Sequence, residues 1–260
     1  MNLTCENIIR DINFYTKKEA YIRTLYKMCG IELFTFCDHS EVNLLAYVCN
    51  KYEDIALVFL DLMKEEQQTE IIPILTTNWA ALVSQKRVKT TILQWAINSE
   101  CPKVVKAVIK LIKQPNDFTY IVTKIFSSSN KANAIQLATQ VGKMEVISSL
   151  LDAAKEHGVV YDVLSSLSDN GLHTMSFVFV NCPSLSKNVL DYVGDRKIEL
   201  LAGMSTSESG SFLAKVMSFS YKCYLMSLYG FENLFECHGF YQPLENDDEV
   251  ELECSVQDSF

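Results

Sequence analysis

The sequence contains few residues that interrupt helices, with only 9 Gly and 5 Pro among 260 residues. Helix-forming Leu, Ile, Ala and Lys are abundant, so the composition argues against a strand-rich or glycine-looped nucleotide-binding architecture and predicts a mostly helical chain. With 48% hydrophobic and 21% charged residues, the balance is that of a globular protein. A chain of this length can bury a large core.

No apolar run is long enough to cross a bilayer, since the most apolar stretches, such as 177–180, span four or five residues. The first fifteen residues include Glu6, Arg10 and Asp11, where a secretory signal needs an unbroken apolar stretch. The 9 cysteines are an odd number spread over the whole chain. We therefore expect a reduced, cytoplasmic protein without a membrane span.

Basic residues are missing from the C-terminal end of the sequence. Residues 245–260 hold seven acidic residues and no Lys or Arg, so residues 1–244 are almost neutral although the chain has a net charge of −9. Binding to a phosphate backbone requires a basic surface, and we therefore expect no nucleic-acid partner. The concentration of like charge predicts that 245–260 is a flexible tail.

Complete catalytic motifs are missing as well. His39 and Glu41 have the His-x-Glu spacing of zinc deaminases, but the Pro-Cys-x-x-Cys that would supply the other ligands does not occur. Residues 203–207 approach a nucleophile elbow, yet Ser207 stands where the second glycine is needed. Neither a phosphate-binding loop nor a dinucleotide-binding turn is present. We expect no enzymatic activity, no cofactor and no metal.

Two Cys and His pairs provide the enzymatic alternative. A thiol-dependent hydrolase or transferase would use Cys37 or Cys237 as nucleophile and His39 or His238 as base. The same four residues could bind zinc, but they lack the Cys-x-x-Cys spacing of zinc sites. A Cys within about 4 Å of a His in a cleft would favour the thiol enzyme.

Internal repeats are present, although they have diverged. Four segments align as units of one pattern: 44–60, 91–109, 134–151 and, more loosely, 171–190. Ile55, Val104 and Val146 occupy equivalent positions, 49 and then 42 residues apart. Each unit predicts a short helix, a tight turn and a second helix. The connections contain further helical patterns at 78–86 and 117–126, so the predicted solenoid is irregular.

Two segments resemble the ankyrin repeat. Residues 142–151, Gly-Lys-Met-Glu-Val-Ile-Ser-Ser-Leu-Leu, resemble the second ankyrin helix, Gly-His-x-Glu-Val-Val-x-x-Leu-Leu. Residues 91–96, Thr-Ile-Leu-Gln-Trp-Ala, are similar to the Thr-Pro-Leu-His-x-Ala of the first helix. The likeness covers 40–195, but the spacing exceeds the usual period of about 33 residues. The Gly-Ala-Asp-x-Asn hairpin signature is absent, so the sequence does not decide between units with and without the family's β-hairpin fingers.

The predicted fold is all-α, an irregular ankyrin-like helical-pair solenoid with helical caps. A helical-pair solenoid of another type, such as a HEAT-like one, is the alternative. The predicted domains are an N-terminal helical cap at 1–39, ankyrin-like repeats at 40–203, a C-terminal helical cap at 204–244 and the acidic flexible tail at 245–260. The central core between repeats is predicted to contain Leu93, Trp95, Val104, Val105 and Val108.

The resemblance implies a function in protein binding. Glutamates in the last twenty residues are similar to the C-terminal translocation signals of type IV secretion effectors from intracellular bacteria, a group in which degenerate ankyrin repeats are frequent. The resemblance therefore implies a secreted virulence effector that reaches the host cytoplasm and binds a host or bacterial protein on its concave face. A purely structural scaffold is a further alternative.

Partner-binding positions follow from the ankyrin frame, in which the residues just before the turn between the two helices face the concave side. Small polar side chains occupy these positions, and two glutamines lie nearby. The candidate partner-binding residues are Asn50, Gln94, Asn98, Ser99, Gln136 and Gln140. We expect them to act by hydrogen bonding and shape matching.

Overall fold

The computed structural model describes residues 4–200, with gaps at 84–85, 125–131, 169–170, 172 and 198. The chain divides into two compact units, 1–221 and 222–260, and all described residues belong to the first. The prediction of a mostly helical chain is confirmed, because the described residues form fourteen α-helices and a single two-stranded sheet. The predicted C-terminal cap at 204–244 and tail at 245–260 lie outside the described residues.

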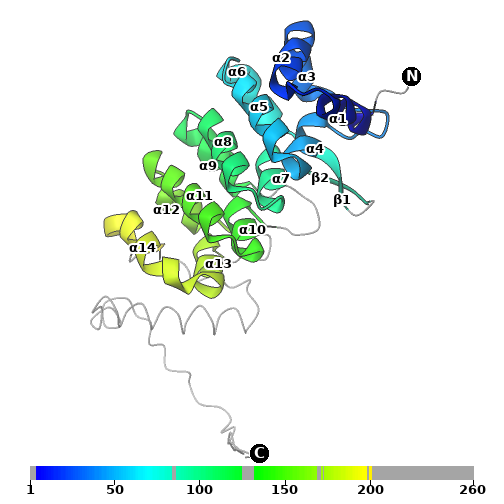
Figure 1. The fold of residues 1–260 in the computed structure, drawn as a ribbon. Coiled ribbons are helices and arrows are strands. Elements are labelled where there is room, and N and C mark those ends of the chain that lie inside the picture. Colours follow the sequence, from blue (N-terminus) through cyan, green and yellow to red (C-terminus); the bar gives the residue numbers. More distant parts are fainter. Residues whose placement is uncertain are drawn as a thin grey trace, which may run out of the picture. The chain divides into compact units, whose positions relative to one another are not determined.

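Along the chain the helices form successive units of up to three (Figure 1), and we call the members of each unit its first, second and third helix. The first helices are α1 (Cys5–Phe14), α4 (Leu44–Lys51), α7 (Ile92–Asn98), α10 (Ala134–Val141) and α13 (Thr174–Asn181). The second helices are α2 (Lys18–Cys29), α5 (Glu53–Met63), α8 (Pro102–Leu111), α11 (Met144–Glu156) and α14 (Pro183–Val193). The third helices are α3 (Glu32–Thr35), α6 (Gln68–Thr76), α9 (Pro115–Thr123) and α12 (Val160–Ser165). A short 3₁₀ helix, Gly194–Arg196, follows α14.

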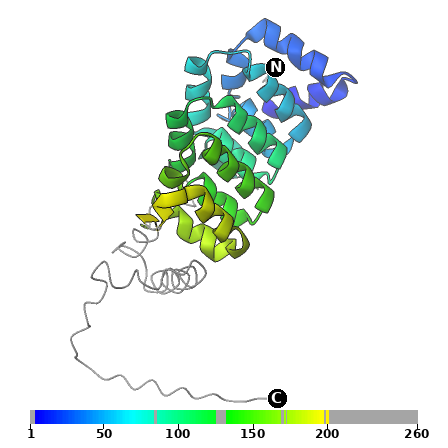
Figure 2. The same ribbon diagram turned by 90° about the vertical axis from the view of Figure 1, so that its left-hand side faces the viewer.

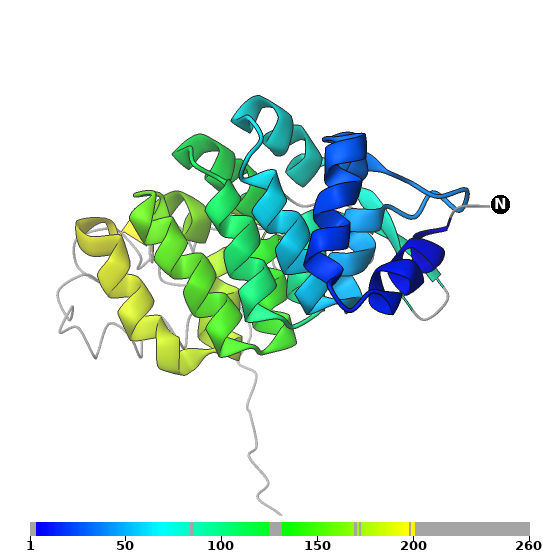
Figure 3. The same cartoon turned by 45° about the horizontal axis from the view of Figure 1, so that its top comes forward.

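Equivalent helices of successive units contact one another. Contacts run from α4 through α7 and α10 to α13, from α2 through α5 and α8 to α11, and from α6 through α9 to α12. The views in Figures 2 and 3 show the second helices side by side in chain order. Each unit therefore packs mainly against its sequence neighbours.

A recurring polar cap fixes where the first helices begin. The side chains of Thr4, Asn43, Thr91 and Asn133 each accept a hydrogen bond from the backbone N–H three residues later. Such caps satisfy backbone donors that have no partner inside the helix. The predicted N-terminal cap at 1–39 contains α1, α2 and α3 in the same order as the later units.

The connection before α7 is a β-hairpin, so the prediction of a helix at 78–86 is wrong. Strands β1 (Trp79–Val83) and β2 (Lys86–Thr90) pair antiparallel, with Trp79 opposite Thr90. The carbonyl of Ala80 accepts a hydrogen bond from the Asn43 N–H at 2.9 Å, so the preceding unit also binds the hairpin. Strand pairing and the contact with Asn43, which lies 37 residues before Ala80, override the local helical pattern.

The other predicted connecting helix, at 117–126, is confirmed as far as Thr123. This helix, α9, begins earlier than predicted because Pro115 occupies its first turn, where the missing N–H costs nothing.

The core lies between the first and second helices. Leu93, Trp95, Val104, Val105 and Val108 all have 0% exposure, which confirms the predicted core. Trp95 also donates its Nε1–H to the Trp79 carbonyl at 3.0 Å, so the core and the hairpin are connected.

Candidate functional site

A row of polar residues lies at the turns between first and second helices. We call Asn50, Asn98, Ser99 and Gln140 the turn ridge. Asn98 and Gln140 are exposed, while Asn50 and Ser99 are half-buried. Contacts between α4, α7 and α10 place these helix ends in consecutive units. The structure thus brings four of the six predicted site residues to accessible positions on successive turns.

The ridge residues differ in how they use their hydrogen-bonding groups. Ser99 donates its hydroxyl to the Ala96 carbonyl at 2.7 Å and so closes the end of α7. Within the described part of the chain, the side-chain amides of Asn50, Asn98 and Gln140 have no hydrogen-bond partner. A side-chain amide offers both donors and acceptors, so these three groups are available to a protein surface.

Gln94 and Gln136 are not available, and their assignment to the partner-binding surface is wrong. Gln94 is only 4% exposed; it donates to the Ala132 carbonyl at 3.2 Å and accepts the Thr90 hydroxyl. Gln136 is 0% exposed and donates to the Thr174 hydroxyl at 3.3 Å. Both side chains reach toward the next unit, so their amides stabilise the contact between units.

The sequence contained a signal for this buried role. Gln94 and Gln136 each stand three residues after a helix-capping residue, the spacing of a capping box. For α10 the box is complete, because Asn133 and Gln136 each accept the other's backbone N–H at 2.9 Å. Spacing alone could therefore have assigned Gln136 to the helix start.

An ion pair links two turns next to the ridge. Lys143 Nζ lies 2.9 Å from Glu100 Oε2, and the two side chains are 49% and 50% exposed. Glu100 directly follows Ser99, and Lys143 follows Gln140 by three residues. The ridge centre therefore contains one exposed carboxylate and one exposed ammonium group.

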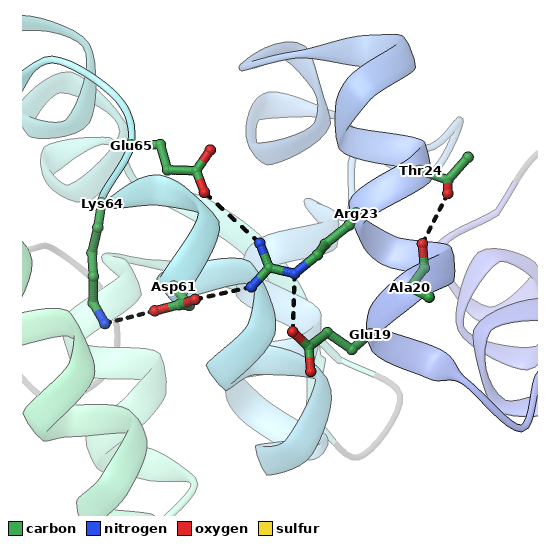
Figure 4. A network of polar contacts seen from close by, with 7 residues as sticks. All are labelled: Glu19, Ala20, Arg23, Thr24, Asp61, Lys64 and Glu65. Carbon is green, nitrogen blue, oxygen red and sulfur yellow. Dashed lines mark hydrogen bonds and ion pairs between the residues drawn. The ribbon is translucent and has the colours of Figure 1, made fainter.

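The second helices carry further ion pairs across unit boundaries. Figure 4 shows Arg23 of α2 reaching Glu19 at 2.9 Å, Asp61 of α5 at 3.2 Å and Glu65 at 3.8 Å. Lys64 lies 2.8 Å from Asp61 and, with Arg23, lowers the pKa of that carboxyl. These charges satisfy one another, so this face offers a partner fewer free groups than the turn ridge does.

A shallow hollow lies between α8 and α11. Lys106 and Lys110 line one side, and Glu145, Asp152 and Glu156 line the other. Lys106 and Glu145 pair with each other at 3.1 Å. Because the hollow is lined by both positive and negative side chains, it does not form a binding site for an ion of one charge.

The residues of the thiol alternative are only partly described. Asp38, which lies between Cys37 and His39, accepts the backbone N–H groups of Cys5, Ser40 and Val42, so its carboxylate stabilises this turn. Partial desolvation raises the pKa of the Cys37 thiol, which is the opposite of what a thiolate nucleophile needs. Cys237 and His238 lie outside the described residues.

The described residues contain no helix with the length and apolar character of a membrane span. In the same part of the chain, no group of three or more His, Cys, Asp and Glu is arranged to hold a metal ion. No family model, curated protein or solved structure matches this chain.

Proposed function

We propose that this chain is a non-enzymatic protein-binding module, built as an irregular ankyrin-like solenoid, and that the turn ridge contacts the partner. The observation that carries the proposal is the pair of exposed amides of Asn98 and Gln140, at the turns of two consecutive units, which have no hydrogen-bond partner among the described residues. Stacked repeats align equivalent positions into an extended binding surface.

The buried core next to the turns supports this role. Trp95 and the neighbouring valines are fully buried, while the side chains of Asn98 and Gln140 are exposed. The side chains of Asn98 and Gln140 can therefore vary without loss of folding. Small polar groups on a fixed scaffold suit a partner surface of mixed polarity.

The test is a double substitution, Asn98→Arg with Gln140→Arg. Thermal unfolding should change little, because exposed substitutions usually shift stability by less than about 0.5 kcal/mol. Affinity for the protein that co-purifies with the wild type should fall at least about tenfold in a calorimetric titration, because two long charged side chains would be buried without partners.

The chain offers a matched control. Gln114→Arg with Asn116→Arg makes the same two replacements at exposed positions at the start of α9, away from the turns. This control should bind as the wild type does. Equal affinity of the ridge variant and the wild type would place the interface elsewhere.

The proposed biological setting is delivery by a bacterial type IV secretion system into the reducing host cytoplasm, where the module binds a host or bacterial protein. The support is the glutamate-rich segment 245–260 and its likeness to such signals. Deletion of 245–260 should abolish translocation of a reporter fusion while leaving the unfolding curve and partner affinity nearly unchanged.

A variant in which the seven Asp and Glu residues of 245–260 become Asn and Gln separates the effect of the segment's charge from that of its length. It should be translocated as poorly as the deletion. Normal translocation of either variant, or unfolding of the truncated chain, would contradict the proposal.

A further inference from the structure

Glu100 adopts a backbone conformation that favours glycine. Its φ is 57°, and the residue lies in the turn between α7 and α8, directly before the residue that caps α8. The equivalent position between α10 and α11 is Gly142, with φ 75°. A residue with a side chain is destabilising in this conformation, whereas glycine adopts it freely.

The ion pair with Lys143 does not account for the glutamate. Both side chains are about half exposed, and exposed pairs contribute little to stability. The fold would thus be served at least as well by glycine at position 100, as it is at 142. Strain of this kind tends to persist where the side chain has a role in function.

The carboxylate of Glu100 has one oxygen available to an external donor. Its Oε2 is held by Lys143, and within the described part of the chain its Oε1 has no partner. The unpartnered amide of Asn98 lies two residues away in the same turn. A guanidinium has five N–H donors in one plane and can satisfy a carboxylate and neighbouring amide carbonyls together.

We propose that Glu100 is the specificity-determining residue of the turn ridge and that it binds an arginine side chain of the protein partner. The proposal rests on the function proposed for the ridge and narrows it to a partner with an exposed basic segment. The charge complementarity is local, because the guanidinium of such a segment would meet the Glu100 carboxylate oxygen that Lys143 does not bind.

Glu41 provides an internal control. It is the other non-glycine residue with positive φ in the described part of the chain, at 60°, and its carboxylate lies 3.6 Å from Lys89. It precedes α4, whereas the ridge lies where the first helices end. Glu41→Gly and Glu100→Gly therefore each replace a glutamate of positive φ and remove an ion pair with a lysine, at opposite ends of the first helices.

The experiment selects peptides from a random twelve-residue library displayed on phage, using the full-length wild-type protein as bait. Arginine-containing peptides should be enriched, and fluorescence polarisation then measures their dissociation constants. Glu100→Gly should not lower the melting temperature but should weaken binding about tenfold or more, whereas Glu41→Gly should bind as the wild type does. Glu100→Asn, which tolerates the turn but lacks the carboxylate, should also bind weakly.

Two results would overturn the inference: selected peptides without arginine enrichment, or unchanged binding to Glu100→Gly and Glu100→Asn. The variant carrying Asn98→Arg and Gln140→Arg distinguishes this failure from failure of the ridge itself. Loss of peptide binding in that variant alone would contradict the role of Glu100 but support binding at the ridge. Unchanged binding in all variants would contradict both proposals.

Discussion

Trp95 is the residue on which the core depends most, and Trp95→Ala is the sharpest test of the packing. The side chain is 0% exposed and is the largest of the fully buried ones. Truncation of a buried Trp to Ala costs about 3 to 5 kcal/mol, because the transfer free energy is lost and a cavity remains. The substitution also removes the Nε1–H that the Trp79 carbonyl accepts.

The two contributions can be separated with Trp95→Phe. Phenylalanine fills most of the space but has no N–H, so we expect a smaller loss, of about 1 to 2 kcal/mol. Phe14→Ala is the matched control, since Phe14 is an aromatic residue with 86% exposure. That substitution should change stability by less than about 0.5 kcal/mol.

Urea unfolding followed by far-ultraviolet circular dichroism measures all three variants. The urea midpoint should fall strongly for Trp95→Ala, moderately for Trp95→Phe and hardly at all for Phe14→Ala. A midpoint for Trp95→Ala within error of the wild type would refute the assignment of Trp95 to the core, and with it the alignment of the repeats.

Two further predictions concern polar contacts. Asn133→Ala removes the α10 cap and the hydrogen bonds from Nδ2 to the hydroxyls of Ser166 at 3.0 Å and Thr174 at 2.6 Å. Urea unfolding should show that the free energy of unfolding falls by about 2 to 3 kcal/mol. A change below about 0.5 kcal/mol would contradict this prediction. Asp61 has a pKa below its ordinary value of 3.8, so its ionised form stabilises the fold above that pH and the contribution disappears as pH falls through the lowered pKa. The melting temperature of Asp61→Asn should therefore lie below that of the wild type at neutral pH and converge with it in acid; parallel curves would contradict the contribution.

Hydrophobic periodicity was enough to predict the paired helices and their buried residues. Val104, Val105 and Val108 recur on one face of α8, and all three are buried. The periodicity is predictive because the spacing of residues along a helix determines which face each side chain occupies. The hairpin at 79–90 could not be predicted in this way, since its strands depend on each other and on Asn43, 37 residues before Ala80.

The candidate site shows the same division. The exposed positions of Asn98 and Gln140 follow from their place at the end of a short helix, so the sequence was sufficient. The burial of Gln94 and Gln136 was not predicted, because their partners Ala132 and Thr174 belong to the next unit. Spacing can assign such a residue to a helix start, but its burial depends on the packing of the neighbouring unit.

By itself, the sequence determined that the chain is mostly helical and where successive helix pairs turn, since composition, caps and apolar spacing act within a few residues. Only the tertiary structure decided that a hairpin fills the connection before α7 and that two glutamines join neighbouring units. It also revealed Glu100 in a conformation that Gly142 adopts in the next turn. These features depend on contacts and backbone angles that arise only when distant segments pack together.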